Sequence, residues 1–126
     1  MKNCKILLVD GDPIYTGEVG EALKADGHTV SVVENRAAAD AALAAAKFDI
    51  VITDLAMEKA DSGFSLAYHI KNDTPDTKVI IATDVNSRHG VKFSVETEAE
   101  RTWIKADSFL DKPYRYEQLK TIIDRL

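Results

Sequence analysis

Short apolar runs alternate along the chain with longer stretches in which apolar residues recur every three or four positions. The runs cover residues 6–9, 30–33, 50–52, 79–82 and 109–110. Most of them are rich in Val and Ile and are almost unbroken by polar residues. This pattern is typical of strands that are covered on both faces, as in a parallel sheet.

The stretches between the runs carry helical patterns. After the first run, apolar residues fall at i, i+4, i+7 and i+8 from Tyr15, and Gly27 stands where a helix commonly ends. Asn35 is suited to cap the next helix, which is mostly alanine. This alanine-rich helix is expected over residues 37–47, and further helices are expected over residues 64–71, 96–105 and 119–126.

The order of elements is therefore a strand followed by a helix, repeated five times. Right-handed crossovers wind such a pattern into an open parallel sheet with helices on both faces. The predicted fold class is α/β, a flavodoxin-like three-layer sandwich with five strands in the order 2-1-3-4-5. In such sheets, ligands bind beyond the carboxyl ends of the strands, where the strand order reverses.

Length and composition narrow the class of protein. A chain of 126 residues favours a single domain, expected over residues 1–126 with no output domain. A net charge of −5 without a basic stripe argues against direct binding of nucleic acid. Cys4 is the only cysteine, which excludes an internal disulfide and a cysteine-rich zinc site. No apolar run is long enough for a signal peptide or a membrane span, so we expect a cytoplasmic protein.

Polar and charged residues stand where the predicted strands end. Asp10, Gly11 and Asp12 follow the first strand, and Asp54 follows the third. Thr83 and Asp84 end the fourth strand, and Lys112 and Pro113 follow the fifth. Because strands one and three are neighbours in the order 2-1-3-4-5, we expect Asp10 and Asp54 to face each other, with Thr83 and Lys112 beside Asp54.

These residues are of the types that can bind a metal ion and accept a phosphoryl group. Neighbouring carboxylates bind a hard cation such as Mg²⁺, which prefers oxygen ligands. A carboxylate is also a nucleophile toward phosphorus and forms an aspartyl phosphate. Such a transfer requires that the charge on the phosphoryl oxygens be neutralised, and a metal ion, an ammonium group and a hydroxyl donor do this.

Four motifs at the strand ends resemble those of a response-regulator receiver domain of two-component signalling. They are ILLVDGDP at 6–13, DIVITDLAM at 49–57, VIIAT at 79–83 and FLDKP at 109–113. Each motif alone is weak, but all four occur in order over essentially the whole chain. The resemblance implies a signalling module rather than an enzyme, phosphorylated by a histidine kinase or a phosphotransfer protein.

The resemblance also implies a role for each matching residue. Asp54 matches the phosphoacceptor. Asp10, Asp54 and the main-chain carbonyl of Ala56 match the ligands of Mg²⁺. Thr83 and Lys112 match the residues that contact the bound phosphoryl group.

Two of the matching positions imply a conformational switch. Thr83 and Phe109 match the residues that move on activation. The implied partners are the phosphoryl donor and an output protein that the sequence does not identify. We expect a monomer or a weak dimer, with no direct contact to nucleic acid or membrane.

The chain departs from the family pattern around the acidic pair. Gly11 stands where the second acidic residue is usual. Asp12 either caps the first helix beside Pro13, which capping preferences favour, or serves as a further metal ligand. Asp84 stands where a small residue is usual, and there it would either repel an incoming phosphate or replace the missing carboxylate. If neither does so, Mg²⁺ should bind more weakly than in a typical receiver.

Two loops also depart from the pattern. The loop over residues 57–63 has glutamate where proline is usual and carries a one-residue insertion, which bears on kinase docking. The stretch over residues 85–96 holds extra residues on a surface that receivers often use for output. These extra residues suggest a partner specific to this protein.

Three other functional classes are alternatives at this point. A pseudo-receiver would use the same fold as a binding module without phosphorylation, and both Gly11 and Asp84 favour it. A haloacid-dehalogenase-like phosphatase would use Asp10 as nucleophile and Asp12 as general acid. That class leaves Asp54 unexplained, and the chain lacks room for its cap and its later acidic motif. A flavin-binding domain is less well supported, because the first turn lacks a phosphate-binding loop rich in Ser, Thr and Gly.

Overall fold

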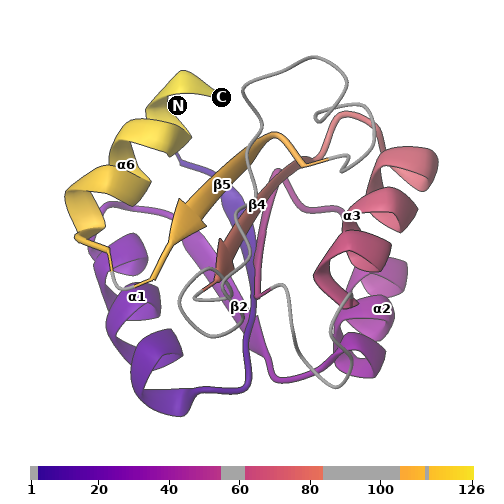
Figure 1. Ribbon diagram of the computed structural model, residues 1–126, viewed down its shortest axis with the longest axis horizontal. Helices are drawn as coiled ribbons and strands as arrows, with labels where there is room; N and C mark the ends of the chain where they lie inside the picture. The colour runs from indigo at the N-terminus through magenta and orange to yellow at the C-terminus, as the bar shows by residue number, and fades with distance from the viewer. Residues whose placement is uncertain (1–2, 55–61, 84–105, 113) are drawn as a thin grey trace.

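The chain forms five parallel strands and four helices in the parts that the computed structural model describes, residues 3–54, 62–83, 106–112 and 114–126 (Figure 1). The strands are β1 (Lys5–Val9), β2 (Thr29–Val33), β3 (Ile50–Thr53), β4 (Lys78–Thr83) and β5 (Ser108–Asp111). The helices are α1 (Pro13–Ala25), α2 (Arg36–Ala45), α3 (Ser62–Asp73) and α6 (Tyr116–Arg125).

The sheet has the order β2-β1-β3-β4-β5, which confirms the predicted topology. Its register aligns the carboxyl ends of the central strands, because Val9 at the end of β1 pairs with Val33 of β2 and with Thr53 of β3. Each strand is longer than its apolar run by one or two residues. Backbone pairing continues through flanking polar residues such as Lys78, which an apolar pattern does not reveal.

Alternate residues of the central strands pack against different helices. In Figure 1, α1 and α6 cover one face of the sheet, and α2 and α3 cover the other. Leu8 packs with Leu23 and Leu119 in the first layer. Leu7 packs in the second layer, with Ala39 and Leu66. The expected cover on both faces holds for the central strands, but it is wrong for the edge strand β2, where Val32 is 46% exposed.

The predicted helix ends are largely confirmed. The side chain of Asn35 accepts a hydrogen bond from the amide of Ala38 and so caps α2. Gly27, which follows α1, has φ +97°, a conformation that favours glycine. We expected α2 to reach residue 47, but it ends at Ala45 because Ala46 is extended and leads the chain to the buried Phe48.

Two further expectations concern the remaining helices. The third helix is longer than its apolar pattern, since α3 runs from Ser62 to Asp73. The helix expected over residues 96–105 lies outside the described part of the chain. Within that part, no helix is both long and apolar enough to cross a membrane.

Candidate functional site

Asp10 and Asp54 lie side by side at the carboxyl edge of the sheet. Each follows directly on a residue of a paired strand, because Val9 of β1 is in register with Thr53 of β3. The amide of Asp54 donates a hydrogen bond to the carbonyl of Val9 at 3.0 Å, which continues the pairing of the two strands. The parallel register therefore brings together two carboxylates that are far apart in the sequence, as predicted.

Asp10 is the more deeply buried of the two carboxylates, with 4% of the residue exposed. Its Oδ1 atom accepts a hydrogen bond from the amide of Asp12 at 3.0 Å. Its Oδ2 atom accepts one from Lys112 Nζ at 2.5 Å. A buried charge is costly unless it is paired and hydrogen-bonded, and these two contacts satisfy both conditions.

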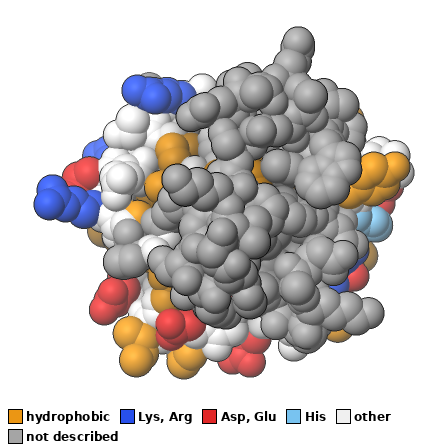
Figure 2. All heavy atoms as spheres, in the orientation of Figure 1, with side chains coloured by type: hydrophobic (Ala, Val, Ile, Leu, Met, Phe, Trp, Pro, Cys, Tyr) orange, Lys and Arg blue, Asp and Glu red, His pale blue; other side chains and the backbone are white. Residues whose placement is uncertain are grey.

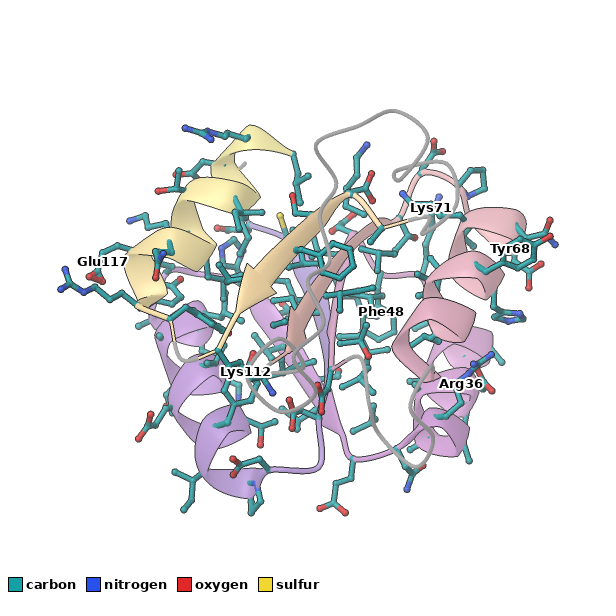
Figure 3. All side chains as sticks on the ribbon, viewed as in Figure 1. Arg36, Phe48, Tyr68, Lys71, Lys112 and Glu117 are labelled. Atoms are coloured by element: carbon teal, nitrogen blue, oxygen red, sulfur yellow. The ribbon has the colours of Figure 1, made fainter. Side chains whose placement is uncertain are left out.

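Lys112 brings its ammonium group to both carboxylates. It follows β5, and Figure 3 shows it between α1 and the ends of the strands. We expected Lys112 beside Asp54, but Nζ lies 4.0 Å from Asp54 Oδ1 and only 2.5 Å from Asp10 Oδ2. The ammonium thus pairs primarily with the more buried carboxylate and remains within reach of the other.

Asp12 caps α1, which is one of the two roles considered for it. Its Oδ1 atom accepts hydrogen bonds from the amides of Ile14 at 3.0 Å and Tyr15 at 3.3 Å. Pro13 occupies the first turn, where its missing N–H is not needed. The Oδ1 atom of Asp12 is therefore engaged by the start of the helix.

The other expected site residues are described only in part. Thr83 ends β4 in register with Asp111, and only its backbone is described. Phe109 on β5 is half-buried against the core layer that contains Phe48. Ala56 and Asp84 lie outside the described residues, as do residues 57–61 and 85–96.

A pair of tyrosines borders the site, and their contact was not predicted from the sequence. The hydroxyl groups of Tyr15 on α1 and Tyr114 before α6 are 2.5 Å apart. Their rings pack edge to face, with centroids 6.0 Å apart and an angle of 82° between the planes. The ammonium of Lys112 lies 4.2 Å from the centroid of the Tyr15 ring. In the sequence, the helical spacing of the apolar residues that begins at Tyr15 predicted only that Tyr15 would pack against the sheet.

Burial extends to higher pH the range over which both tyrosine hydroxyls stay protonated. It raises the pKa of Tyr114 to about 12. It also raises the pKa of Tyr15, and the neighbouring Tyr114 and the charges of Asp10 and Asp54 add to this effect. Neither hydroxyl therefore contributes a negative charge near Lys112 at neutral pH.

The donors at this edge suit a hard cation in type but are incomplete in number. Asp10 and Asp54 supply carboxylate oxygens, the kind of ligand that Mg²⁺ prefers. Among the described residues, no group of three His, Cys, Asp or Glu side chains is arranged to hold a metal. In Figure 2, acidic side chains gather along the lower part of the face, toward which β4 and β5 run in Figure 1. This charge favours the approach of a cation.

Comparison with known proteins gives a family match over nearly the whole chain. The family model described as "Response regulator receiver domain" matches residues 6–124. The transcriptional regulatory protein GlrR of Escherichia coli is 34% identical over 98% of this chain and 26% of its own length. The DNA-binding transcriptional regulator NtrC of Rhizobium meliloti is 29% identical over 99% of this chain and 24% of its own length. The chain thus spans about a quarter of each relative.

Solved structures give the same fold. The response regulator protein TrrA of Thermotoga maritima, in complex with Mg²⁺ and beryllofluoride, superposes with a TM-score of 0.76. It is 24% identical and covers 99% of this chain and 98% of its own. A response regulator protein of Burkholderia pseudomallei with a phosphorylated aspartic acid has a TM-score of 0.75 and 26% identity. That match covers 97% of this chain and 66% of the other.

Proposed function

Because the chain belongs to the response regulator receiver domains of two-component signalling, we propose that Asp54 accepts a phosphoryl group from a histidine kinase or a phosphotransfer protein. The observation that carries the proposal is the position of Asp54. It stands at the end of β3 next to Asp10, with the Lys112 ammonium 4.0 Å from its Oδ1 atom. A second carboxylate that can help to hold a metal ion and an ammonium group are two of the groups that stabilise an aspartyl phosphate.

The proposed reaction is a phosphoryl transfer from histidine to aspartate. An oxygen of the Asp54 carboxylate attacks the phosphorus of the donor's phosphohistidine. The new bond joins that oxygen to phosphorus, and the bond between phosphorus and the histidine nitrogen breaks. The electron pair of the broken bond stays on the imidazole. The protein's task is to position the reactants and to neutralise charge, as in other phosphoryl transfers.

Asp10, Asp54 and the main-chain carbonyl of Ala56 are the proposed ligands of Mg²⁺. When bound, the ion would neutralise charge on the phosphoryl oxygens. TrrA, which shares this fold, contains Mg²⁺ with beryllofluoride, and this supports the choice of metal. With Asp12 engaged in capping α1, it is not among the proposed ligands, and Asp84 remains a candidate.

Lys112 is the proposed counter-ion of the phosphoryl group. Its ammonium pairs with Asp10 in the unphosphorylated chain and lies 4.0 Å from Asp54. A dianionic group on Asp54 would draw the ammonium from Asp10 toward Asp54. The hydroxyl of Thr83 would supply a further hydrogen bond, and Phe109 would shift within its half-buried site to pass the change to the surface.

The output of this chain is proposed to go through an output protein or domain. The expectation that nucleic acid is not involved is not supported by the relatives, since these include a DNA-binding transcriptional regulator. The chain spans only about a quarter of that relative, so DNA contact there concerns a much larger protein. The negative charge of this chain still argues that the receiver itself does not hold the DNA.

The proposal is tested by incubating the purified protein with acetyl phosphate and Mg²⁺ and recording its intact mass. We expect a mass gain of one phosphoryl group. The gain should be absent from Asp54→Asn, which keeps the size of the side chain but removes the nucleophilic carboxylate. It should also be absent when the metal is removed with a chelator.

Two other results would point elsewhere. No mass gain in a protein with a native circular dichroism spectrum would favour the pseudo-receiver, in which Gly11 leaves the site short of a ligand. A gain that persists in Asp54→Asn but not in Asp10→Asn would favour the dehalogenase-like reading, in which Asp10 is the nucleophile. Membership of the receiver family argues against that second outcome.

A further inference from the structure

Lys112 lies between a carboxylate and an aromatic ring. Its Nζ atom is 2.5 Å from Asp10 Oδ2 and 4.2 Å from the centroid of the Tyr15 ring. The side chain of Lys112 is only 18% exposed. A cation at this distance from a ring is attracted by the negative face of the ring, and the attraction is stronger when water is excluded.

We propose that Tyr15 is a positioning residue for the phosphotransfer reaction, which holds the Lys112 ammonium between the two carboxylates and is itself held by Tyr114. This inference rests on the proposed function, since Lys112 is taken to be the counter-ion of the phosphoryl group. Tyr15 lies outside all four of the sequence motifs.

The ring of Tyr15 has a physical task at this position. A lysine side chain has several rotatable bonds, and fixing it costs up to about 2 kcal/mol of conformational entropy. Contact with the ring restricts the ammonium without using any of its three N–H donors. Those donors remain available for Asp10 and for an oxygen on Asp54.

Two further contacts hold the ring in place. The amide of Tyr15 donates a hydrogen bond to Asp12 Oδ1 at 3.3 Å, within the cap of α1. The hydroxyl of Tyr15 meets that of Tyr114 at 2.5 Å. Tyr114 stands two residues after Lys112, so this contact ties the ring to the segment that carries the lysine. Tyr15 is thus fixed from α1 and from the chain after β5.

The test compares two substitutions of Tyr15 that separate the ring from the hydroxyl. Tyr15→Phe keeps the ring face below the ammonium, whereas Tyr15→Leu removes it and keeps an apolar side chain. We expect the rate of Mg²⁺-dependent phosphorylation by acetyl phosphate to fall about three- to tenfold in Tyr15→Leu. In Tyr15→Phe, which keeps the ring and loses only its hydroxyl contact with Tyr114, the rate should fall less, by about twofold.

A double substitution distinguishes positioning from a general loss of structure. If Tyr15 acts through Lys112, then Tyr15→Leu should add almost nothing to the defect of Lys112→Ala. The NMR signal of the Lys112 ε-CH₂ group gives a second readout, assigned by its absence from Lys112→Ala. The ring should shift this signal in the parent and in Tyr15→Phe, and the shift should vanish in Tyr15→Leu.

The outcomes separate this inference from the proposed function. Failure of the parent to take up phosphate would overturn the proposed function and, with it, the role given to Tyr15. Uptake by the parent at a rate that Tyr15→Leu matches or exceeds would overturn the inference alone. The inference would also be overturned if Tyr15→Leu slowed the reaction by the same factor with and without Lys112.

Discussion

Gly11 stands where receivers usually have a second acidic residue. The backbone at this position does not require a glycine. It is exposed and does not adopt the left-handed conformation that favours glycine. A Cβ atom built at this position would lie 3.6 Å from the carbonyl oxygen of Glu34, which is an ordinary contact distance. A side chain at position 11 is therefore tolerated, and what the glycine removes is a carboxylate next to Asp10.

Restoring this carboxylate should strengthen binding of the metal. A carboxylate a few ångströms from a divalent cation gains about 1–2 kcal/mol even in a largely aqueous setting. We therefore expect Gly11→Asp to bind Mg²⁺ about tenfold more tightly than the parent in isothermal titration. Gly11→Asn is the matched control, because it has nearly the same shape and no charge. Equal affinities for Gly11→Asp and Gly11→Asn would show that position 11 does not face the metal.

The first turn of α1 makes several contacts that organise the site. The Asp12 carboxylate caps the helix, and its amide donates a hydrogen bond to Asp10 Oδ1 at 3.0 Å. The hydroxyl of Thr16 donates to the carbonyl of Asp12 at 3.1 Å. The same turn carries Tyr15, whose ring lies below Lys112. The start of this helix thus sets the positions of a carboxylate and an ammonium group.

The cap gives a prediction that separates the two roles considered for Asp12. Loss of a capping side chain costs about 1 kcal/mol of stability. Asp12→Ala should therefore lower the free energy of unfolding in urea by about that amount, whereas Asp12→Asn, which keeps the acceptor oxygen, should change it by a few tenths of a kcal/mol.

The affinity for Mg²⁺ completes this test. If the carboxylate only caps the helix, Asp12→Asn should bind the metal about as well as the parent. A marked loss of affinity in Asp12→Asn with unchanged stability would identify Asp12 as a metal ligand after all.

Two hydrogen bonds made by tyrosine side chains join α1 and its C-cap to the last part of the chain. The Tyr15 hydroxyl meets that of Tyr114 at 2.5 Å, and the Tyr116 hydroxyl donates to Asp26 Oδ2 at 2.6 Å. These contacts link segments that are some ninety or more positions apart in the sequence. They hold α1 and the start of α6 together on one face of the sheet. Each hydrogen bond needs at least one neutral hydroxyl, so the stability that these contacts provide depends on pH.

The direction of this dependence follows from the pKa of Tyr114. Burial raises it from an ordinary value of 10.0 to about 12, so the folded state favours the neutral phenol. The stabilisation is fully present below pH 10 and is lost as the pH rises through about 12. We expect the free energy of unfolding in urea to decrease over this range.

Single substitutions isolate this effect from other groups that titrate at alkaline pH. Tyr114→Phe removes the buried phenol and should make the decrease less steep. Tyr68→Phe is the control, because Tyr68 is 60% exposed and the substitution should leave the slope unchanged. Identical slopes for all three proteins would mean that the pair of Tyr15 and Tyr114 does not contribute to the alkaline transition.

Local pattern determined most of the fold. Short apolar runs, most of them rich in Val and Ile, predicted the five strands, and the caps at Asn35 and Gly27 marked real helix ends. These features depend on the periodicity of side chains and on the conformations that single residues allow, so they can be seen in the sequence. The strand ends also predicted the neighbouring positions of Asp10 and Asp54, because parallel strands end at the same edge.

Tertiary structure alone decided how the charges are paired and how they are supported. The sequence placed Lys112 near Asp54, but the ammonium lies closer to Asp10 because Asp10 is almost fully buried and its charge requires a partner. The contact of Tyr15 with Tyr114 joins α1, which follows β1, to the chain that follows β5. The strands β1 and β5 are not neighbours in the sheet. Strand order predicts contacts only between adjacent strand ends, whereas side chains that reach across the edge meet according to their length and packing.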